Sequence, residues 1–308
     1  MLDVTNKYGT VYVTTWEQNQ TVIDVVIKVT ADKEDQLDKR LNSIDVAFSA
    51  TNAKVTAQTK IGNFSGRNSS MEINYTIKIP KKNTIDLTNQ YGGIILGKIY
   101  GTAILKVQYG NLTIDELNGS KNEINLQYSD AANINTIALT KINAQYSGIK
   151  INKATDELIL NSEYTDTRIG SVNRFNLKGT YGDVKVDSAS EVMGDCDYMN
   201  AKFGTVTKHF NMSFTYGDIK IDRITKDVRE VSISGSYSNI AIKYDANHAF
   251  DFTAKTSYGD VKGLQNLTLT EKREVSTVGS YKGYYRSGGS ARITLSCSYG
   301  DINITKLP

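Results

Sequence analysis

The decapeptides KGTYGDVKVD (residues 178–187) and SFTYGDIKID (residues 213–222) share one pattern, and SCSYGDINIT (residues 296–305) repeats it. In each copy, apolar and polar residues alternate on both sides of a tyrosine, for example at Val184 and Val186. An alternation with a period of two indicates a β-strand with one buried face. The residues after the tyrosine are turn formers, so each tyrosine marks a corner between two strands.

The corner tyrosines recur in steps of 17 to 23 residues. The sequence places them at Tyr91, Tyr109, Tyr128, Tyr146, Tyr164, Tyr181, Tyr198, Tyr216, Tyr237, Tyr258 and Tyr299, with Tyr281 as a further candidate. A period near 20 residues is typical of solenoids, whose coils stack on one another. We therefore predict an all-β, single-stranded β-solenoid with about 18–21 residues per coil. A β-sandwich would have a similar strand density, but it would leave the aligned tyrosines unexplained.

The alternation places each tyrosine on the inward side of its corner. This predicts a structural ladder of stacked rings whose hydroxyl groups reach water or the backbone. Rings exposed to solvent would instead form an aromatic stripe suited to sugar rings or partner proteins. Solvent exposure of the rings distinguishes the two interpretations.

The first 80 residues depart from this regularity although a Tyr-Gly corner already occurs at residues 8–9. Residues 21–30 and 71–79 have the pattern of strands, and residues 31–44 place apolar side chains on one helical face. We expect residues 1–80 to form N-terminal strands and a capping helix that continue into regular coils over residues 81–308. An atypical segment of this kind would cover the exposed edge of the first coil.

After the last predicted strand the sequence ends within three residues, at Lys306, Leu307 and Pro308. If that coil is the last of the stack, it has little to cover it. The sequence therefore suggests that this edge is covered by another protein, that it is covered by a second copy through self-association of the C-terminal coil, or that it is blunted only by Lys306 and Pro308.

Composition and charge exclude several classes of protein. The net charge of +3 comes from 36 basic and 33 acidic residues without a long run of either sign, which does not favour nucleic-acid binding. No apolar run approaches the roughly 18 residues of a membrane span, and the first residues lack the layout of a signal peptide. If the protein is exported, its signal is not in this sequence.

Few residues suggest catalysis or metal binding, and we predict no catalytic residues, no metal site and no cofactor. Cys196 and Cys297 precede corner tyrosines by two residues, so both are predicted to be buried free thiols about five coils apart. His209 and His248 are isolated from other metal-ligand types. Turn chemistry accounts for the aspartates of the Gly-Asp corners, at Asp183, Asp218, Asp260 and Asp301, better than calcium binding does.

The lengthened repeat YKGYYRSGGSAR (residues 281–292) is the candidate binding site. It gathers Tyr284, Tyr285, Arg286 and Arg292 beside glycines, and insertions in solenoids form surface loops that often bind ligands. A tolerated insertion without a function would have the same appearance.

The sequence resembles the bacterial putative adhesin family with autotransporter-adhesin-head or GIN-type β-solenoid domains, whose function is uncharacterised. The stretches that resemble it are residues 8–29, residues 72–114 and the Tyr-Gly coils that follow. The resemblance implies a right-handed β-helix and an exported protein of the periplasm, outer membrane or cell surface. It supplies no catalytic residues.

Two further classes of function remain open beside a non-enzymatic adhesin or binding rod whose partner is a glycan or an envelope protein. One is a polysaccharide-acting enzyme, which would need carboxylates clustered in a cleft. The other is a self-assembling envelope scaffold, which concentration-dependent oligomers would support.

Overall fold

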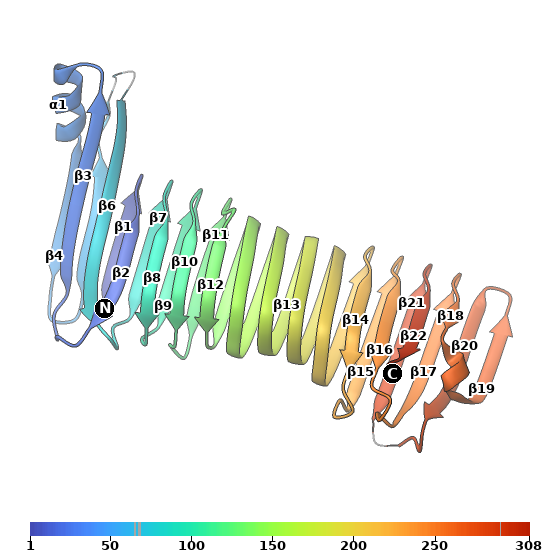
Figure 1. The fold of residues 1–308 in the computed structure, drawn as a ribbon. Coiled ribbons are helices and arrows are strands. Elements are labelled where there is room, and N and C mark those ends of the chain that lie inside the picture. The colour runs from blue at the N-terminus through green and yellow to red at the C-terminus, as the bar shows by residue number, and fades with distance from the viewer. Residues whose placement is uncertain (65, 67–68, 290) are drawn as a thin grey trace. The chain divides into compact units, whose positions relative to one another are not determined.

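The computed structural model describes residues 1–64, 66, 69–289 and 291–308. The chain divides into two compact units, an N-terminal unit (Met1–Lys150) and a C-terminal unit (Ile151–Pro308). Both are built almost entirely from strands that pair in parallel from coil to coil, as the repeat predicted (Figure 1). Because an interior coil of each unit pairs with a neighbour on both sides, its backbone N–H and C=O groups find partners in the adjacent coils.

In the N-terminal unit, each regular coil contributes two strands, one on either side of its corner tyrosine. The elements of this unit are β1 (Leu2–Lys7), β2 (Val11–Trp16), β3 (Val22–Ala31), α1 (Glu34–Asn42), β4 (Ile44–Ala50), β5 (Val55–Ile61), β6 (Ser69–Pro80), β7 (Ile85–Gln90), β8 (Ile94–Ile99), β9 (Ala103–Gln108), β10 (Leu112–Leu117), β11 (Asn122–Gln127), β12 (Ala132–Ile137) and the start of β13 (Thr140–Thr215). Alternate residues of these strands fill the space between the two strand layers, as Leu87 and Leu105 do.

The first coil of the chain is not the first coil of the stack. β1 lies between β5 and β7, and β2 lies between β6 and β8, all in parallel. The end of the stack is formed by β4, antiparallel to β5, and by β3, antiparallel to β6. The strands predicted in the first 80 residues are therefore confirmed, and these strands rather than a helix complete the end of the unit.

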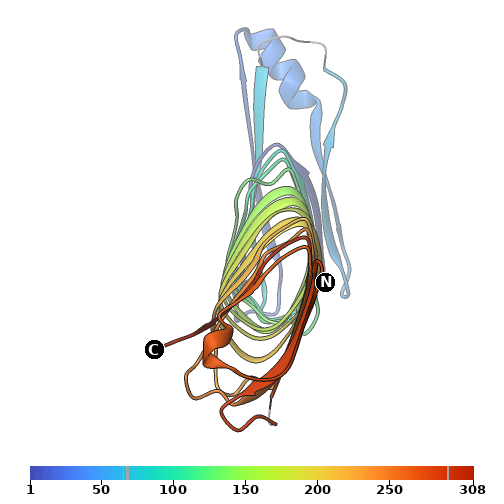
Figure 2. The same ribbon diagram turned by 90° about the vertical axis from the view of Figure 1, so that its right-hand side faces the viewer.

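The predicted helix is present as α1, beside the extended ends of β3 and β6 (Figure 2). Its first turn carries Glu34 and Asp35 and its last turn Lys39 and Arg40, which suits the helix dipole. None of its residues is buried, and Leu41 on its apolar side is 41% exposed. The helix therefore covers little of the core.

The C-terminal unit continues with two strands per coil and ends in a hairpin. Its elements are the remainder of β13, β14 (Ile219–Ile224), β15 (Glu230–Ser236), β16 (Ile240–Tyr244), β17 (Phe250–Ser257), β18 (Val261–Lys262), a 3-10 turn η1 (Leu264–Asn266), β19 (Thr268–Val275), β20 (Val278–Tyr285), β21 (Arg292–Ser298) and β22 (Ile302–Lys306). Large apolar side chains such as Phe203 and Phe210 fill its interior.

The coil at residues 292–306 lies inside the stack, not at its end (Figure 1). β21 pairs in parallel with β15 on one side and with β17 on the other, and β22 lies in the same way between β16 and β18. The prediction of a bare C-terminal coil was wrong, and self-association through that coil loses its basis, because both of its edges are already paired.

The hairpin of β19 and β20 closes the end of the stack instead. β20 runs antiparallel to β17, and β19 pairs with β20 as the outermost strand of the described residues. Every residue of β19 is exposed, and its middle carries Glu271, Lys272, Arg273 and Glu274. Charged side chains on an edge strand oppose further pairing.

Candidate functional site

The corner tyrosines form a ladder of parallel rings in each unit. In the N-terminal unit, neighbouring ring centroids are 4.9 to 5.2 Å apart with interplanar angles of 4 to 12°, in the order Tyr8, Tyr91, Tyr109, Tyr128 and Tyr146. In the C-terminal unit, they are 4.7 to 5.0 Å apart with angles of 2 to 18°, in the order Tyr164, Tyr181, Tyr198, Tyr216, Tyr237, Tyr299 and Tyr258. The predicted stacking is thus present within each unit.

The tyrosine rings lie outside the core, so the inward placement was wrong. Each ladder tyrosine has a positive φ between 48 and 59°, and each is 38 to 58% exposed. The left-handed conformation rotates the side chain out of the alternation that the flanking strands follow. Tyr281 is not part of either ladder: it is buried in β20, and its hydroxyl group donates to Glu274 at 2.5 Å.

Stacking decides which parts of the rings a ligand can reach. At centroid distances near 5 Å, each ring face within a ladder is covered by its neighbours. The ring edges and the hydroxyl groups remain accessible, so the ladder presents a row of polar edges and not a set of flat platforms. Within a ladder, sugar rings therefore cannot stack on the covered aromatic faces.

The backbone at these corners carries a cost that the stacking offsets. The left-handed region costs a residue with a side chain roughly 1–2 kcal/mol, whereas each stacked aromatic pair contributes about 0.5–1.5 kcal/mol. We expect Tyr198→Ala to lose both stacking contacts and keep the strain, while Tyr198→Asn loses the contacts but suits the left-handed backbone. Urea unfolding should place Tyr198→Ala about 1 kcal/mol below Tyr198→Asn. Equal stabilities would mean that the corner is not strained.

Glycine follows the tyrosine at corners where the neighbouring coil comes closest. A Cβ on Gly217 would lie 2.0 Å from the carbonyl oxygen of Met199, and one on Gly110 would lie 1.9 Å from that of Gly92. Where another residue takes this position, as at Ser129 and Met199, its side chain is buried. The corners are therefore of two types. In one, the backbone of the neighbouring coil leaves no room for a Cβ and glycine follows the tyrosine. In the other, a larger residue follows the tyrosine and its side chain is buried.

In the C-terminal unit, a ladder of aspartates and asparagines flanks the tyrosines. Asp166 accepts from the backbone N–H of Asp183 at 3.0 Å, Asp218 accepts from that of Asn239 at 2.9 Å, and Asp301 accepts from that of Asp260 at 3.0 Å. These oxygens satisfy corner N–H groups of the adjacent coil. The turn interpretation of the Gly-Asp corners is thus supported. No group of three or more potential metal ligands occurs among the described residues.

In the N-terminal unit, the tyrosine ladder is flanked by glutamines. Gln90 donates to Gln108 at 2.8 Å, Gln108 donates to Gln127 at 2.9 Å, and Gln127 donates to Gln145 at 3.2 Å. The chain of side-chain amides repeats with the coils, so this flank is polar and uncharged.

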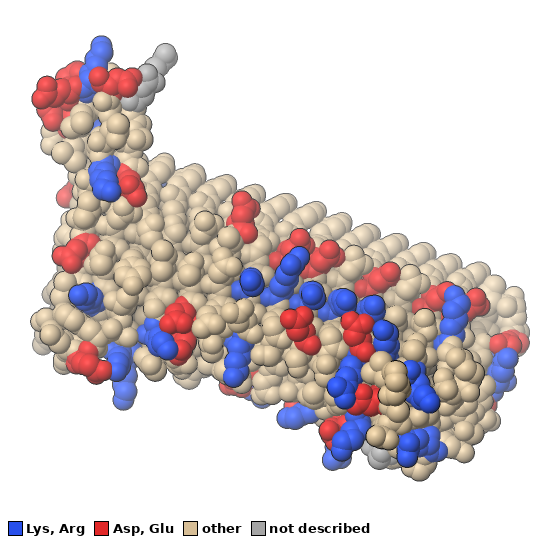
Figure 3. Space-filling view, in the orientation of Figure 1, with Lys and Arg blue, Asp and Glu red and all other residues tan. Residues whose placement is uncertain are grey.

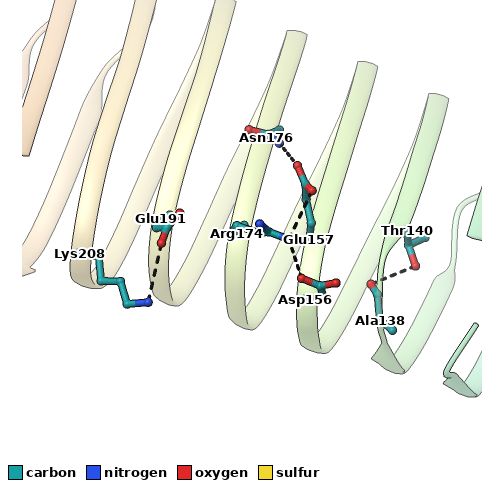
Figure 4. A network of polar contacts seen from close by, with 8 residues as sticks. All are labelled: Ala138, Thr140, Asp156, Glu157, Arg174, Asn176, Glu191 and Lys208. Carbon is teal, nitrogen blue, oxygen red and sulfur yellow. Dashed lines mark hydrogen bonds and ion pairs between the residues drawn. The ribbon is translucent and has the colours of Figure 1, made fainter. Parts of the chain in front are cut away.

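Charged groups at the opposite corners pair between adjacent coils. Arg174 contacts Asp156 at 2.8 Å and Glu157 at 3.7 Å, and Lys208 contacts Glu191 at 3.7 Å (Figure 4). Basic and acidic side chains are interspersed over β13 to β16 on the face that Figure 3 shows. Exposed pairs of this kind add little stability, but they keep the two signs mixed.

The predicted binding loop is divided between the inside and the outside of the stack. Tyr285 packs against Tyr244, with ring centroids 5.0 Å apart, and donates its hydroxyl hydrogen to Ala246 at 3.0 Å. Tyr284 and Arg292 lie on the outer face, on either side of Asp251, while the exposed Arg286 donates to Ala246. Ser290 of this loop lies outside the described residues. The four candidates therefore do not converge on one point.

The two cysteines are buried free thiols, as predicted. Burial raises the pKa of Cys196 to about 12 and also raises that of Cys297. Their coils are three ladder steps apart rather than five, since Tyr299 follows Tyr237 in the stack. Three steps are about 14 Å at the usual strand spacing, still too far for a disulfide.

His248 is buried in the C-terminal unit, whereas His209 is exposed. The His248 Nε2 atom lies 2.9 Å from the carbonyl oxygen of Val228, and Nδ1 has no partner among the described residues. Burial lowers the pKa of His248, although Asp245 and Asp227 oppose the shift.

A pH-dependent stability follows from this burial. The unfolded chain binds a proton at His248 near pH 6.5, while the folded chain resists it to a lower pH. Stability should therefore decrease as the pH falls below about 6.5 and level off below the folded pKa. Urea unfolding at pH 7.5 and pH 5 should show a smaller loss for His248→Gln than for the wild type. Identical losses would assign the pH dependence to other groups.

Stacked coils with in-register aromatic and polar ladders define a β-solenoid protein. A family model matches residues 2–305, and the chain belongs to the Toastrack DUF4097 family. No helix among the described residues has the length and apolar character needed to span a membrane.

Two solved structures similar to the chain carry the names of a putative cell adhesion protein and a putative adhesin. One is a putative cell adhesion protein from Clostridium sporogenes, with 9% identity and a TM-score of 0.19, covering 99% of this chain and 92% of that chain. The other is a putative adhesin from Bacteroides fragilis, with 13% identity and a TM-score of 0.26, covering 99% of this chain and 91% of that chain. No curated protein matches the chain.

Proposed function

We propose that the protein is a non-enzymatic, exported envelope protein that acts as an adhesin or binding protein at the periplasm, outer membrane or cell surface. Its partner is a glycan or an envelope protein. The observation that carries the proposal is the exposed tyrosine ladder. Every ladder ring is more than a third exposed. Glycine would adopt the left-handed backbone at lower cost than tyrosine does, and a buried ring would be less costly than an exposed one.

The chemistry of the ladder supports contact with a partner more than catalysis. Ring edges and phenol hydroxyl groups can donate and accept hydrogen bonds to sugars or polypeptide, and tyrosine is enriched in binding interfaces. The carboxylates nearest to the C-terminal ladder are engaged with backbone N–H groups of adjacent coils, as at Asp166 and Asp218. Such engaged carboxylates are poorly suited to serve as a general acid and base pair.

The proposal is tested by binding to envelope material. Protein-coated beads are incubated with purified bacterial cell-wall and outer-membrane preparations, using the wild type and the triple variant Tyr181→Asn, Tyr216→Asn, Tyr299→Asn. Asparagine tolerates the left-handed backbone, so the variant should remain folded. Tyr100→Asn is the matched control, because Tyr100 is 45% exposed but lies outside the ladders.

We expect wild type and control to bind and the triple variant to lose at least about tenfold in affinity, as for central contacts of an interface. Wild-type protein that binds none of the preparations would contradict the proposed function. Unchanged binding by the folded triple variant would remove the ladder as the contact surface. Release of sugar fragments from a glycan panel would contradict the absence of enzymatic activity.

A further inference from the structure

A second surface of the C-terminal unit carries an array of hydroxyl groups. On the outer face of β15 and β21, three side chains of each strand lie opposite one another: Ser232 and Thr294, Ser234 and Ser296, and Ser236 and Ser298. We call these six residues the hydroxyl strip. All six are at least partly exposed, while the alternate residues Ile233 and Leu295 are buried.

The strip extends by one coil on each side. Ser213 and Thr215 of β13 continue it next to β15, and Thr253 and Ser257 of β17 continue it next to β21. Hydroxyl groups thus recur about every 4.8 Å across the coils and about every 6.6 Å along the strands. Segments far apart in the sequence become one surface because residues 292–298 lie between β15 and β17.

The hydroxyl groups of the strip are not engaged by the described part of the chain. Among the described residues, none of the six side chains makes a hydrogen bond to another protein group, whereas Ser213 at the margin donates to Asp195. Serine also has little to gain from packing in an exposed strand. Because these side chains are short, a ligand can approach the strands closely. Their hydroxyl groups remain available to it as hydrogen-bond donors and acceptors.

The borders of the strip define its direction. One border is the tyrosine ladder, where Tyr237 and Tyr299 directly follow the last hydroxyl residues of β15 and β21. The other border is a charged row that includes Glu230 and Arg292. A chain-like ligand would fit between these borders and run across the coils, along the tyrosine edges.

The chemistry of the strip favours an uncharged carbohydrate. A polyanion would need several cations. Among the described residues, the strip and its extensions on β13 and β17 contain one cation, Lys255 of β17, and Arg292 at the border lies opposite Glu230. A protein partner would need aromatic or aliphatic anchors in pockets, which the strip lacks. Carbohydrate hydroxyl groups donate and accept like those of serine, and one sugar ring is about as long as the spacing between coils.

We propose that the hydroxyl strip, together with the edges of Tyr237 and Tyr299, binds a neutral polysaccharide chain lying across the coils. The inference rests on the proposed binding function and specifies its ligand. Removal of three of these hydroxyl groups, with their hydrogen bonds to the polysaccharide, should weaken its binding about tenfold or more.

The test uses calorimetry with cellohexaose, maltohexaose and chitohexaose on the full chain. The triple variant Ser232→Ala, Ser234→Ala, Ser296→Ala is compared with the wild type and with the control Thr88→Ala, Thr113→Ala, which removes hydroxyl groups at outer positions of β7 and β10. Circular dichroism checks that each variant is folded. Backbone NMR provides a second readout through shifts of β15 and β21 amides on addition of sugar.

We expect at least one neutral hexasaccharide to bind wild type and control, with affinity reduced about tenfold or more in the triple variant and with shifts confined to β15, β21 and their neighbours. Absence of binding by all three sugars, or equal affinity in the triple variant, would overturn the inference. If the triple variant still binds the envelope preparations as wild type does, the strip is excluded while the proposed function stands. Wild type that binds neither sugars nor preparations would contradict both.

Discussion

Removal of residues 292–308 should abolish cooperative folding of the C-terminal unit. These residues form the coil between β15–β16 and β17–β18. The coil buries Ile293, Leu295, Ile302 and Ile304, each no more than 1% exposed. Burial of such side chains is worth about 1.5–3 kcal/mol each, so their combined loss approaches the whole stability of a typical domain. The hairpin end would also lose its parallel connection to the rest of the unit.

Urea unfolding followed by circular dichroism measures this effect. Removal of Leu307 and Pro308 alone is the control, because both follow the last strand. We expect the control to unfold in a single transition close to that of the full chain. The longer deletion should show a noncooperative transition or an aggregated product. A sharp transition for the longer deletion, at a similar urea concentration, would mean that the surrounding coils close the gap without these residues.

Replacement of Phe203 by alanine should strongly destabilise the C-terminal unit. Phe203 is completely buried and meets Phe210 edge to face, with ring centroids 4.9 Å apart and an interplanar angle of 83°. Truncation of a buried phenylalanine to alanine costs about 3–5 kcal/mol, because neighbouring coils held in register can relax little into the cavity.

Phe48→Ala is the control for this substitution, since Phe48 is 57% exposed. A surface substitution of this kind should change stability by about 0.5 kcal/mol or less. Both variants are compared with the wild type in urea unfolding at pH 7.5. A Phe203→Ala variant as stable as Phe48→Ala would show that the core collapses around the vacated space.

The repetitive part of the fold could be predicted because short sequence patterns determine each coil. A two-residue alternation, a turn after each tyrosine and a period near 20 residues define coils whatever their neighbours are. The same reasoning identified β3, β6 and α1, since their hydrophobic patterns differ from those of the coils. It also placed Cys196 and Cys297 in the core.

The order of the coils could not be predicted in the same way. Every coil offers its neighbours nearly the same shape, so the sequence near Tyr299 does not indicate that it stacks between Tyr237 and Tyr258. The sequence favoured inward tyrosines over the exposed aromatic stripe, because a positive φ is uncommon for a large side chain. The hydroxyl strip was missed because its halves, EVSISGS (230–236) and RITLSCS (292–298), adjoin only after folding.

Because β21 and β22 lie between earlier strands, the order in which the coils are synthesised differs from the order in which they stack. Asn239 and Asp301, in contact across adjacent coils, are 62 residues apart in the sequence. During synthesis, β17 and β18 emerge before the layer that joins them to β15 and β16. Such delayed long-range closure slows folding. A prematurely terminated molecule would also display no finished hydroxyl strip, so recognition through this surface would be reserved for molecules whose synthesis had run through residue 298.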